Sequence, residues 1–264
     1  MKTAEQLAQQ AEAFRAIIDQ NLPTPSPMIR ISPDHTLIGN EVMWGGIWRQ
    51  PDLDVKLRSI ATITAQCVNG MDFGLRHQIR VGLTLGLLPQ KIKAMFVELK
   101  FYAGVPASVF ALLRCQEVID EREEWKALDK PLEHGWLSSL EDKMQRGREL
   151  RRKAWGEKAD AELASSIVHE MLPESAMIVD SYLFGEIWAR SPLDTKERMV
   201  MVLAVLMCRN HLRQLRRQIG YALDAGLSKR EICETFAQAG WYRGWPHVED
   251  ALIEAKEVFA ERGV

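Results

Sequence analysis

The stretch LRHQIRVGLTLGL at residues 75–87 returns, 140 positions later, as LRRQIGYALDAGL at residues 215–227. When residues 41–120 are aligned without a gap on residues 181–260, 23 of the 80 positions are identical. Average residue frequencies would give about 5 identities by chance. A period of 140 residues is far longer than that of a solenoid repeat, so the chain is predicted to be a tandem duplication of a whole domain.

Each copy carries apolar residues at helical spacing, together with helix start and stop signals. Asp54 is a predicted N-cap, and Gly86 and Gly104 are predicted to end helices. In the second copy Ser228 and Glu231 form a predicted capping box. No segment alternates with a period of two residues over a useful length, so the fold class is predicted to be all-α. The predicted helices are 54–68, 71–86, 88–104 and 105–123, and 193–208, 211–226, 227–244 and 245–261.

The similarity between the copies also suggests domain boundaries. The stretch between the copies is highly charged and is interrupted by Pro131 and Gly135, so we expect a partly helical linker that crosses the surface. Its basic run at 146–153 is expected to be a solvated face. The predicted division is an N-terminal helical extension (1–27), repeat 1 (28–125), the linker (126–165) and repeat 2 (166–264).

Composition is that of an ordinary globular protein, with 47% hydrophobic residues, 27% charged residues and a net charge of −2. The weak net charge gives no reason to expect binding to nucleic acid or to a membrane surface. No apolar run approaches the roughly 20 residues needed to span a bilayer, and the N-terminus lacks a secretory core, so we expect a cytoplasmic protein. The four cysteines form no Cys-x-x-Cys pair and show no zinc spacing, so we expect reduced thiols and no metal site.

Several short sequence motifs occur together in each copy. WGGIWRQPDLDVKLR (44–58) corresponds to FGEIWARSPLDTKER (184–198), and YAGVP (102–106) corresponds to YRGWP (242–246). With the stretch at 75–87, these motifs resemble the carboxymuconolactone decarboxylase family, which lies within the alkylhydroperoxidase-like all-α superfamily. The stretch RGRELRRKAWG (146–156) resembles the segment that precedes the decarboxylase domain.

This resemblance implies an assembly and a site. Units of the family pair through helix hairpins and form rings, so this chain would be an internal pseudo-dimer, and three chains would complete a ring of six units. The resemblance also implies a cofactor-free pocket near the interface between units. The function implied is that of a carboxy-lyase of the 4-carboxymuconolactone decarboxylase type, acting on a small carboxylic acid from aromatic compound catabolism.

Two alternatives stay open. One is a cofactor-free lyase, isomerase or cyclase that acts on another small organic acid, and the other is a non-catalytic, ligand-binding helical assembly. Peroxidase activity is disfavoured, because that branch of the superfamily needs a Cys-x-x-Cys pair. The corresponding positions are Gly70 and Phe73 in repeat 1, and Asn210 and Arg213 in repeat 2.

Candidate catalytic residues follow from the resemblance and from the differences between the copies. His77 stands where the family places its recurrent histidine, and its counterpart is Arg217, which can bind a carboxylate but cannot transfer protons near neutral pH. His247 is a second acid–base candidate in repeat 2. Tyr102 could orient or stabilise a substrate, and Tyr242 is its counterpart. A structural role is the alternative for each of them.

The candidate substrate-binding residues are arginines and aromatic residues. Arg58, Arg80, Arg198 and Arg217 could hold carboxylates through a planar fork of donors. For Arg58, an ion pair with the aspartate four residues earlier is an equally good explanation. Trp44 and Trp48 could line an apolar pocket, with core packing as the alternative.

Overall fold

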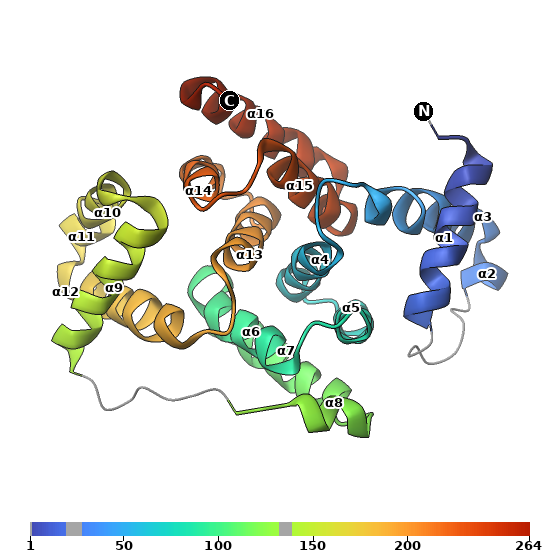
Figure 1. Cartoon of the computed structure of the whole chain (residues 1–264), viewed down its shortest axis with the longest axis horizontal. Coiled ribbons are helices and arrows are strands. Elements are labelled where there is room, and N and C mark those ends of the chain that lie inside the picture. The colour runs from blue at the N-terminus through green and yellow to red at the C-terminus, as the bar shows by residue number, and fades with distance from the viewer. Residues whose placement is uncertain (1, 20–27, 132–138) are drawn as a thin grey trace.

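The computed structural model describes residues 2–19, 28–131 and 139–264, and over these residues the chain forms helices and no strands (Figure 1). The first half contains α1 (Ala4–Ile18), α2 (Met28–Ile31), α3 (Pro33–Ile38), the π-helix η2 (Gly39–Trp44), the 3-10 helix η3 (Ile47–Arg49), α4 (Val55–Asn69), α5 (Asp72–Thr84), α6 (Pro89–Ala103), α7 (Val105–Ile119) and α8 (Glu123–Leu128). The second half contains α9 (Leu140–Trp155), α10 (Glu157–Ala164), α11 (Ile167–Met171), α12 (Pro173–Tyr182), the π-helix η4 (Leu183–Trp188), α13 (Thr195–Cys208), α14 (Leu212–Asp224), α15 (Lys229–Arg243) and α16 (Trp245–Arg262).

The predicted helix ends are confirmed by their hydrogen bonds and backbone angles. The Asp54 side chain accepts from the backbone N–H of Lys56 at the start of α4. Ser228 and Glu231 form the predicted capping box of α15. Gly104 joins α6 to α7 at φ 90°, a conformation that L side chains rarely adopt. The local sequence therefore sets where the helices begin and end.

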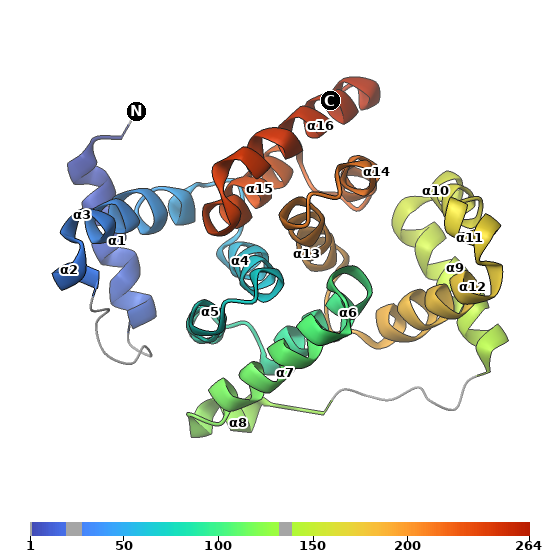
Figure 2. The same cartoon turned by 180° about the vertical axis from the view of Figure 1, so that it is seen from behind.

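The centre of the molecule is a reciprocal packing of the two repeats. α4 of repeat 1 lies against α13 of repeat 2, as both views show (Figures 1 and 2). α15 of repeat 2 packs on α4, and α6 of repeat 1 packs on α13. One continuous apolar core joins the two repeats. Each repeat therefore covers the first long helix of the other, which brings residues distant in sequence together at two equivalent places.

The linker has a role that the sequence analysis did not foresee. α9 is not a connection across the surface: it packs closely on η4, as α1 packs on η2 in the first half. Figure 1 shows these two helical groups at opposite ends of the molecule. A Cβ atom at Gly45 would collide with the backbone carbonyl of Leu7 in α1, and one at Gly185 would collide with that of Lys143 in α9. The N-terminal helix and the linker helix are thus equivalent parts of the two halves.

Aromatic side chains hold α1 and α9 in place. Phe14 of α1 lies 5.9 Å from Trp44 and 5.5 Å from Trp48 between ring centroids. Trp155 of α9 lies 5.0 Å from Trp188 in an edge-on arrangement, one that aromatic rings favour. Trp44 and Trp48 are both buried, so the core-packing explanation accounts for much of their environment.

The basic run at 146–153 is only partly the solvated face that was expected. Arg151 is 5% exposed and forms an ion pair with Asp160 at 2.7 Å. Gly135, predicted to interrupt the linker, lies outside the described residues. Of the helices that the structure describes, none is long and apolar enough to cross a membrane.

The close approach of α9 to η4 predicts the effect of adding one methyl group. Gly185→Ala would force the two backbones apart, so we expect a loss of about 3 kcal/mol in the free energy of unfolding, at the upper end for overpacking. Gly45→Ala should behave similarly through α1. The measurement is urea denaturation followed by circular dichroism.

Gly39→Ala is the matched control, because a Cβ at Gly39 meets no atom within 4 Å. It should leave the unfolding free energy unchanged or raise it by a few tenths of a kcal/mol, or ~1 kcal/mol at most. Equal stability of Gly185→Ala and Gly39→Ala would contradict the packing described above.

Candidate functional site

Two buried polar clusters lie where the repeats cover each other, and their members correspond at the 140-residue spacing. Each cluster combines the tryptophan, arginine and glutamine of one repeat with residues from the third long helix of the other. We name them the Arg58 cluster (Trp48, Arg58, Thr62 and Gln78 of repeat 1 with Glu234, Gln238 and Tyr242 of repeat 2) and the Arg198 cluster (Trp188, Arg198 and Gln218 of repeat 2 with Glu98 and Tyr102 of repeat 1).

In the Arg58 cluster the arginine is fully engaged. Arg58 is 1% exposed, and its Nη2 atom forms an ion pair with Glu234 and donates to the Gln50 carbonyl at 2.7 Å. Its Nη1 atom donates to Gln238 Oε1 at 3.3 Å. The aspartate one turn earlier, Asp54, caps α4 instead of forming the ion pair considered from sequence. Burial lowers the pKa of Arg58, and the Glu234 carboxylate opposes that shift.

Tyr242 closes the same cluster. Its hydroxyl accepts from Trp48 Nε1 at 3.0 Å and from Gln78 Nε2 at 3.4 Å, while its backbone carbonyl accepts from Asn69 at 2.9 Å. Burial raises the pKa of the Tyr242 hydroxyl. Most polar groups of this cluster therefore satisfy one another, although Gln78 Oε1 is buried without a hydrogen-bond partner.

The polar atoms of the Arg198 cluster form fewer hydrogen bonds with one another. Arg198 is 5% exposed and Glu98 is fully buried, and Arg198 Nε donates to Glu98 Oε2 at 3.1 Å. The guanidinium also lies 4.3 Å from the Trp188 ring centroid, a cation–π distance. Glu98 Oε1, Arg198 Nη2 and Trp188 Nε1 are buried and make no hydrogen bond of normal geometry, although the indole N–H lies close enough to Glu98 to lower its pKa; Gln218 Oε1 is also buried without a partner. Buried polar groups without partners destabilise a protein, which makes such a concentration unusual for purely structural residues.

The electrostatics of this cluster favour protonated acids. Burial raises the pKa of Glu98, while Arg198 and the nearby indole N–H of Trp188 act in the opposite direction. Burial also raises the pKa of Tyr102, and the Glu98 carboxylate adds to that shift. Arg217, the counterpart of His77, favours the ionised form of Tyr102. The cluster thus combines a protonatable carboxyl group, a phenol and the guanidinium of Arg198, and Arg217 lies near enough to act on the phenol.

A pocket lies between two of the elements that supply the Arg198 cluster, α6 and η4, although no member of the cluster lines it. It has a volume of about 320 Å³ and is walled by α6, α12 and η4, with Phe101, Ile178, Val179 and Ile187 as its apolar lining and Lys100 at its edge. A smaller cavity of about 10 Å³ shares Val97, Ile187 and Arg190 with this pocket and is also lined by Ala94. Ala94, Glu98 and Phe101 follow one another on one face of α6, because residues three or four positions apart in a helix are neighbours.

His77 lies outside both clusters. It packs beside Trp44 and Phe73, with centroid distances of 6.2 and 6.3 Å. The electrostatic groups around it are Arg80, Asp19 and Arg15. Burial lowers the pKa of His77 to about 4, with the positive charge of Arg80 adding to the effect. At neutral pH this imidazole is therefore uncharged and can accept a proton.

Other predicted site residues are spread over the molecule. Arg80 forms a bidentate ion pair with Glu121 at 2.7 and 2.5 Å, so its guanidinium is occupied. His247 lies in the first turn of α16 with its Nδ1 atom buried and unbonded. The structure therefore brings together Arg198, Tyr102 and Arg217 in one place, and Arg58, Trp48 and Tyr242 in the other.

The cysteines show no sign of activation. All four thiols are free, and burial raises the pKa of Cys67, Cys115 and Cys208 to about 12. A thiolate is the reactive form, so these side chains are poor nucleophiles. In the described part of the chain, no group of three or more His, Cys, Asp or Glu residues is arranged to hold a metal ion.

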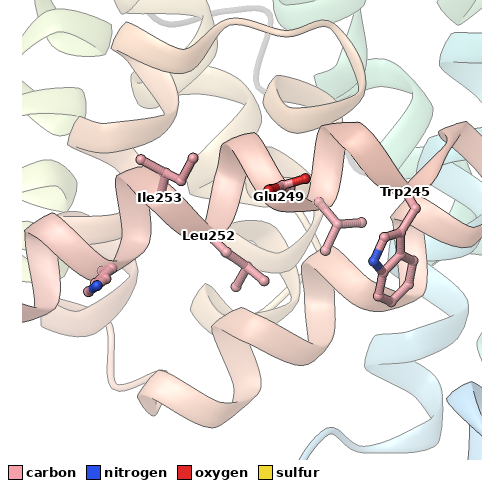
Figure 3. A pocket seen from close by; sticks show the side chains of 6 residues that line it. Trp245, Glu249, Leu252 and Ile253 are labelled. Atoms are coloured by element: carbon pink, nitrogen blue, oxygen red, sulfur yellow. The ribbon is translucent and has the colours of Figure 1, made fainter.

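A third hollow lies on the outer face of α16, away from either cluster. It has a volume of about 340 Å³ and is lined by Trp245, Leu252 and Ile253, with Glu249 beside them (Figure 3). Trp245 is 55% exposed and Ile253 is 54% exposed. The counterpart face on α7 exposes Val105, Val109 and Leu113. These two exposed apolar rows occupy equivalent positions in the two repeats.

The two halves both match one family model, described as the carboxymuconolactone decarboxylase family, over residues 37–117 and 173–257. The chain belongs to this family. The two matched segments make it a tandem-domain member of the carboxymuconolactone decarboxylase family, with the all-α fold that the sequence predicted.

Two known proteins are similar to parts of this chain. An uncharacterized 15.0 kDa protein from the nqo9-nqo10 intergenic region of Paracoccus denitrificans is 38% identical over 80 residues, which is 30% of this chain and 60% of that protein. A 4-carboxymuconolactone decarboxylase from Acinetobacter baylyi is 25% identical over 124 residues, which is 47% of this chain and 92% of that enzyme. The family thus includes a decarboxylase.

Sequence reasoning missed Thr62, Gln78 and Gln218, and it missed the carboxylate and amide residues that the third long helices supply: Glu98, Glu234 and Gln238. A signal was present, because Glu98 aligns with Gln238 and Glu234 aligns with Ala94 in the 140-residue comparison. α6 and α15 have the same bounds at this spacing but are identical at only three of their 15 positions, so these two differences do not stand out from the others. The comparison of the repeats concentrated on identical positions and on His77. It therefore did not consider positions at which only one repeat has a glutamate.

The depressed pKa of His77 predicts how stability depends on pH. The unfolded chain takes up a proton at His77 near pH 6.5, whereas the folded chain does not do so until about pH 4. Acidification through this window therefore favours the unfolded state. Between pH 7 and pH 4, the denaturation midpoint of the wild type should fall more than that of His77→Gln. Parallel falls in the two proteins would show that His77 titrates normally.

Proposed function

We propose that this chain is a cofactor-independent decarboxylase of a small unsaturated carboxylic acid of the 4-carboxymuconolactone type, and that the reaction takes place at the Arg198 cluster. The observation that carries this proposal is the fully buried Glu98, whose Oε1 atom has no partner, beside Arg198 Nη2, which also has none. Membership of a family that includes a 4-carboxymuconolactone decarboxylase supports the reaction class.

The pocket beside the cluster suits a small organic acid. Its volume of about 320 Å³ lies at the lower end of typical ligand sites, and its lining is mostly apolar, with two cations, Lys100 and Arg190, and one carboxylate, Glu186. The substrate would enter between α6 and η4, so that its carboxylates face arginine side chains and its ring contacts Phe101 and Ile187. The site requires both repeats, because α6 belongs to one and η4 to the other.

The chemistry needs three things from the protein. As the bond between carbon and the carboxylate breaks, carbon dioxide leaves and the electron pair passes into the conjugated system of the substrate, which gives an enolate-like anion. Arg198 and Arg217 would stabilise this developing charge, and Tyr102 would donate a hydrogen bond to it. A proton must then reach carbon, and the Glu98 carboxyl group would supply it. Because the substrate accepts the electrons, no additional electron sink is needed.

Glu98 fits the acid role better than His77 does. Burial raises the pKa of Glu98, so its carboxyl group retains a proton at a higher pH than an exposed glutamate would. The pKa of His77 is lowered to about 4, so at neutral pH its side chain is not the imidazolium that acts as a general acid. His77 also lies beside the N-terminal helix and outside the clusters of inter-repeat polar residues.

The proposal predicts that Glu98→Gln lowers kcat by about 100- to 10,000-fold, the range typical of losing a general acid. Glutamine can keep the hydrogen bond from the arginine, as Gln238 does for Arg58. The fold and KM should therefore change much less than kcat. The measurement is the loss of ultraviolet absorbance of 4-carboxymuconolactone in the presence of purified protein.

His77→Asn is the matched control, since it alters the residue favoured from the resemblance but leaves the Arg198 cluster intact. It should keep kcat within a few-fold of the wild type. If His77→Asn abolished turnover while Glu98→Gln retained it, the chemistry would belong to the surroundings of His77 and not to the Arg198 cluster. Absence of turnover in the wild type with this lactone would reject the substrate class.

We also propose that copies of the chain assemble through the apolar rows of α7 and α16. Support comes from their repetition at equivalent positions of the two repeats, which is what a ring of alternating repeats would require. A ring of three chains is the assembly that family resemblance favours.

The assembly proposal predicts that a charge at the centre of either row weakens association. Leu113→Glu and Ile253→Glu should each lower the mass measured by light scattering, from that of an oligomer towards that of a 30.1 kDa chain. Both side chains are more than half exposed, so the folded state should survive. A wild-type mass of a single chain would refute the proposal.

A further inference from the structure

The two arginines at equivalent positions differ in what their Nη2 atoms contact. Arg58 Nη2 forms the ion pair with Glu234 and donates to the Gln50 carbonyl. Arg198 Nη2 is buried and contacts no acceptor. Both arginines begin from the same turn of equivalent helices, so the difference arises from their surroundings.

The missing partner can be traced to a single residue. α6 and α15 correspond at every position, and Ala94 of α6 stands where Glu234 stands in α15. The alanine side chain lacks the carboxylate that Glu234 presents to Arg58. Ala94 instead lines the cavity of about 10 Å³ that adjoins the larger pocket of about 320 Å³. The place of the absent carboxylate therefore lies next to a ligand-sized space.

We infer that a carboxylate of the substrate binds Arg198 in the place that the Glu234 carboxylate occupies on Arg58. Glu234 then acts as an internal counterpart of the substrate that keeps the Arg58 cluster occupied, and each chain binds one acid instead of two. Ala94 and Glu234 determine which of the two equivalent sites is open. This inference rests on the proposed function for its choice of the Arg198 cluster, and it adds the group that recognises the acid.

The neighbouring groups are compatible with an incoming negative charge. Glu98 shares Arg198, so an ionised Glu98 would repel a second carboxylate, whereas a protonated Glu98 would not. Burial favours the protonated form, and its free Oε1 atom leaves room for a further hydrogen bond. Arg190 lines the same small cavity as Ala94, although it is paired with Glu186 at 3.1 Å.

The test uses the full chain and measures binding by isothermal titration calorimetry. The probes are sorbate, a small unsaturated monocarboxylate, and sorbamide, its neutral equivalent. The wild type should bind one sorbate per chain and should bind sorbamide at least about tenfold more weakly, as expected for the loss of a charge-assisted hydrogen bond. Equal affinity for the two probes would overturn the inference.

Ala94→Glu installs on α6 the carboxylate that α15 already has. It should weaken sorbate binding at least about tenfold, because the new side chain would take the place of the ligand carboxylate on Arg198. Ala94→Ser is the control of unchanged charge and should bind sorbate within about twofold of the wild type, well below the tenfold step of 1.4 kcal/mol. Circular dichroism establishes that both variants fold, and unchanged binding by a folded Ala94→Glu protein would contradict the inference.

Glu234→Ala makes the opposite change and keeps the inference testable if Ala94→Glu does not fold. Removing the internal carboxylate leaves Arg58 Nη2 with only the Gln50 carbonyl as acceptor, so the number of sorbate molecules bound should rise from one to two per chain. A stoichiometry that stays at one in the folded variant would overturn the idea that Glu234 occupies an equivalent site. Because binding is measured without turnover, these results stand apart from the kcat of Glu98→Gln, which tests the proposed reaction.

Discussion

The burial of one arginine from each repeat beneath a helix of the other repeat is the constraint on which the structure depends. A buried guanidinium must be hydrogen-bonded, because buried donors without partners are strongly destabilising. Arg58 finds its partners on α15, and Arg198 finds Glu98 on α6. Each repeat therefore supplies what the arginine of the other needs, and the apolar packing of α4 on α13 fixes the geometry in which this exchange occurs.

Because each repeat supplies the partners for the arginine of the other, duplication within one chain allows the two arginine sites to become different. In a symmetric pair of identical units, any substitution at position 94 or 234 would appear in both sites. Once the units are joined in one chain, one site can keep a carboxylate of its own and the other can lose it. The Arg58 cluster, with Glu234 in place, is largely satisfied, whereas the Arg198 cluster retains several unbonded polar atoms. Stability and ligand binding can thus be divided between two sites that began alike.

The sequence predicted the parts of the fold that depend on local chemistry. Caps such as Asp54, turns such as Gly104 and the helical spacing of apolar residues act within a few positions of the chain, so they can be recognised without the tertiary structure. The equivalence of α1 and α9 could not be predicted in this way. It depends on the absence of a side chain at Gly45 and Gly185 and on contacts with residues that the repeat comparison did not align.

The candidate site was harder to predict for a related reason. Arg198 was recognised as a candidate, but its partner Glu98 lies in the other repeat and differs in type from its own counterpart. A single sequence shows that Glu98 aligns with Gln238, yet only the fold shows that Glu98 faces Arg198. His77 attracted attention because histidines titrate near neutral pH, and burial removes that property. What a residue type can do chemically therefore depends on its environment. In the proposed function, the proton donor is for this reason a buried glutamate and not the histidine that the sequence favoured.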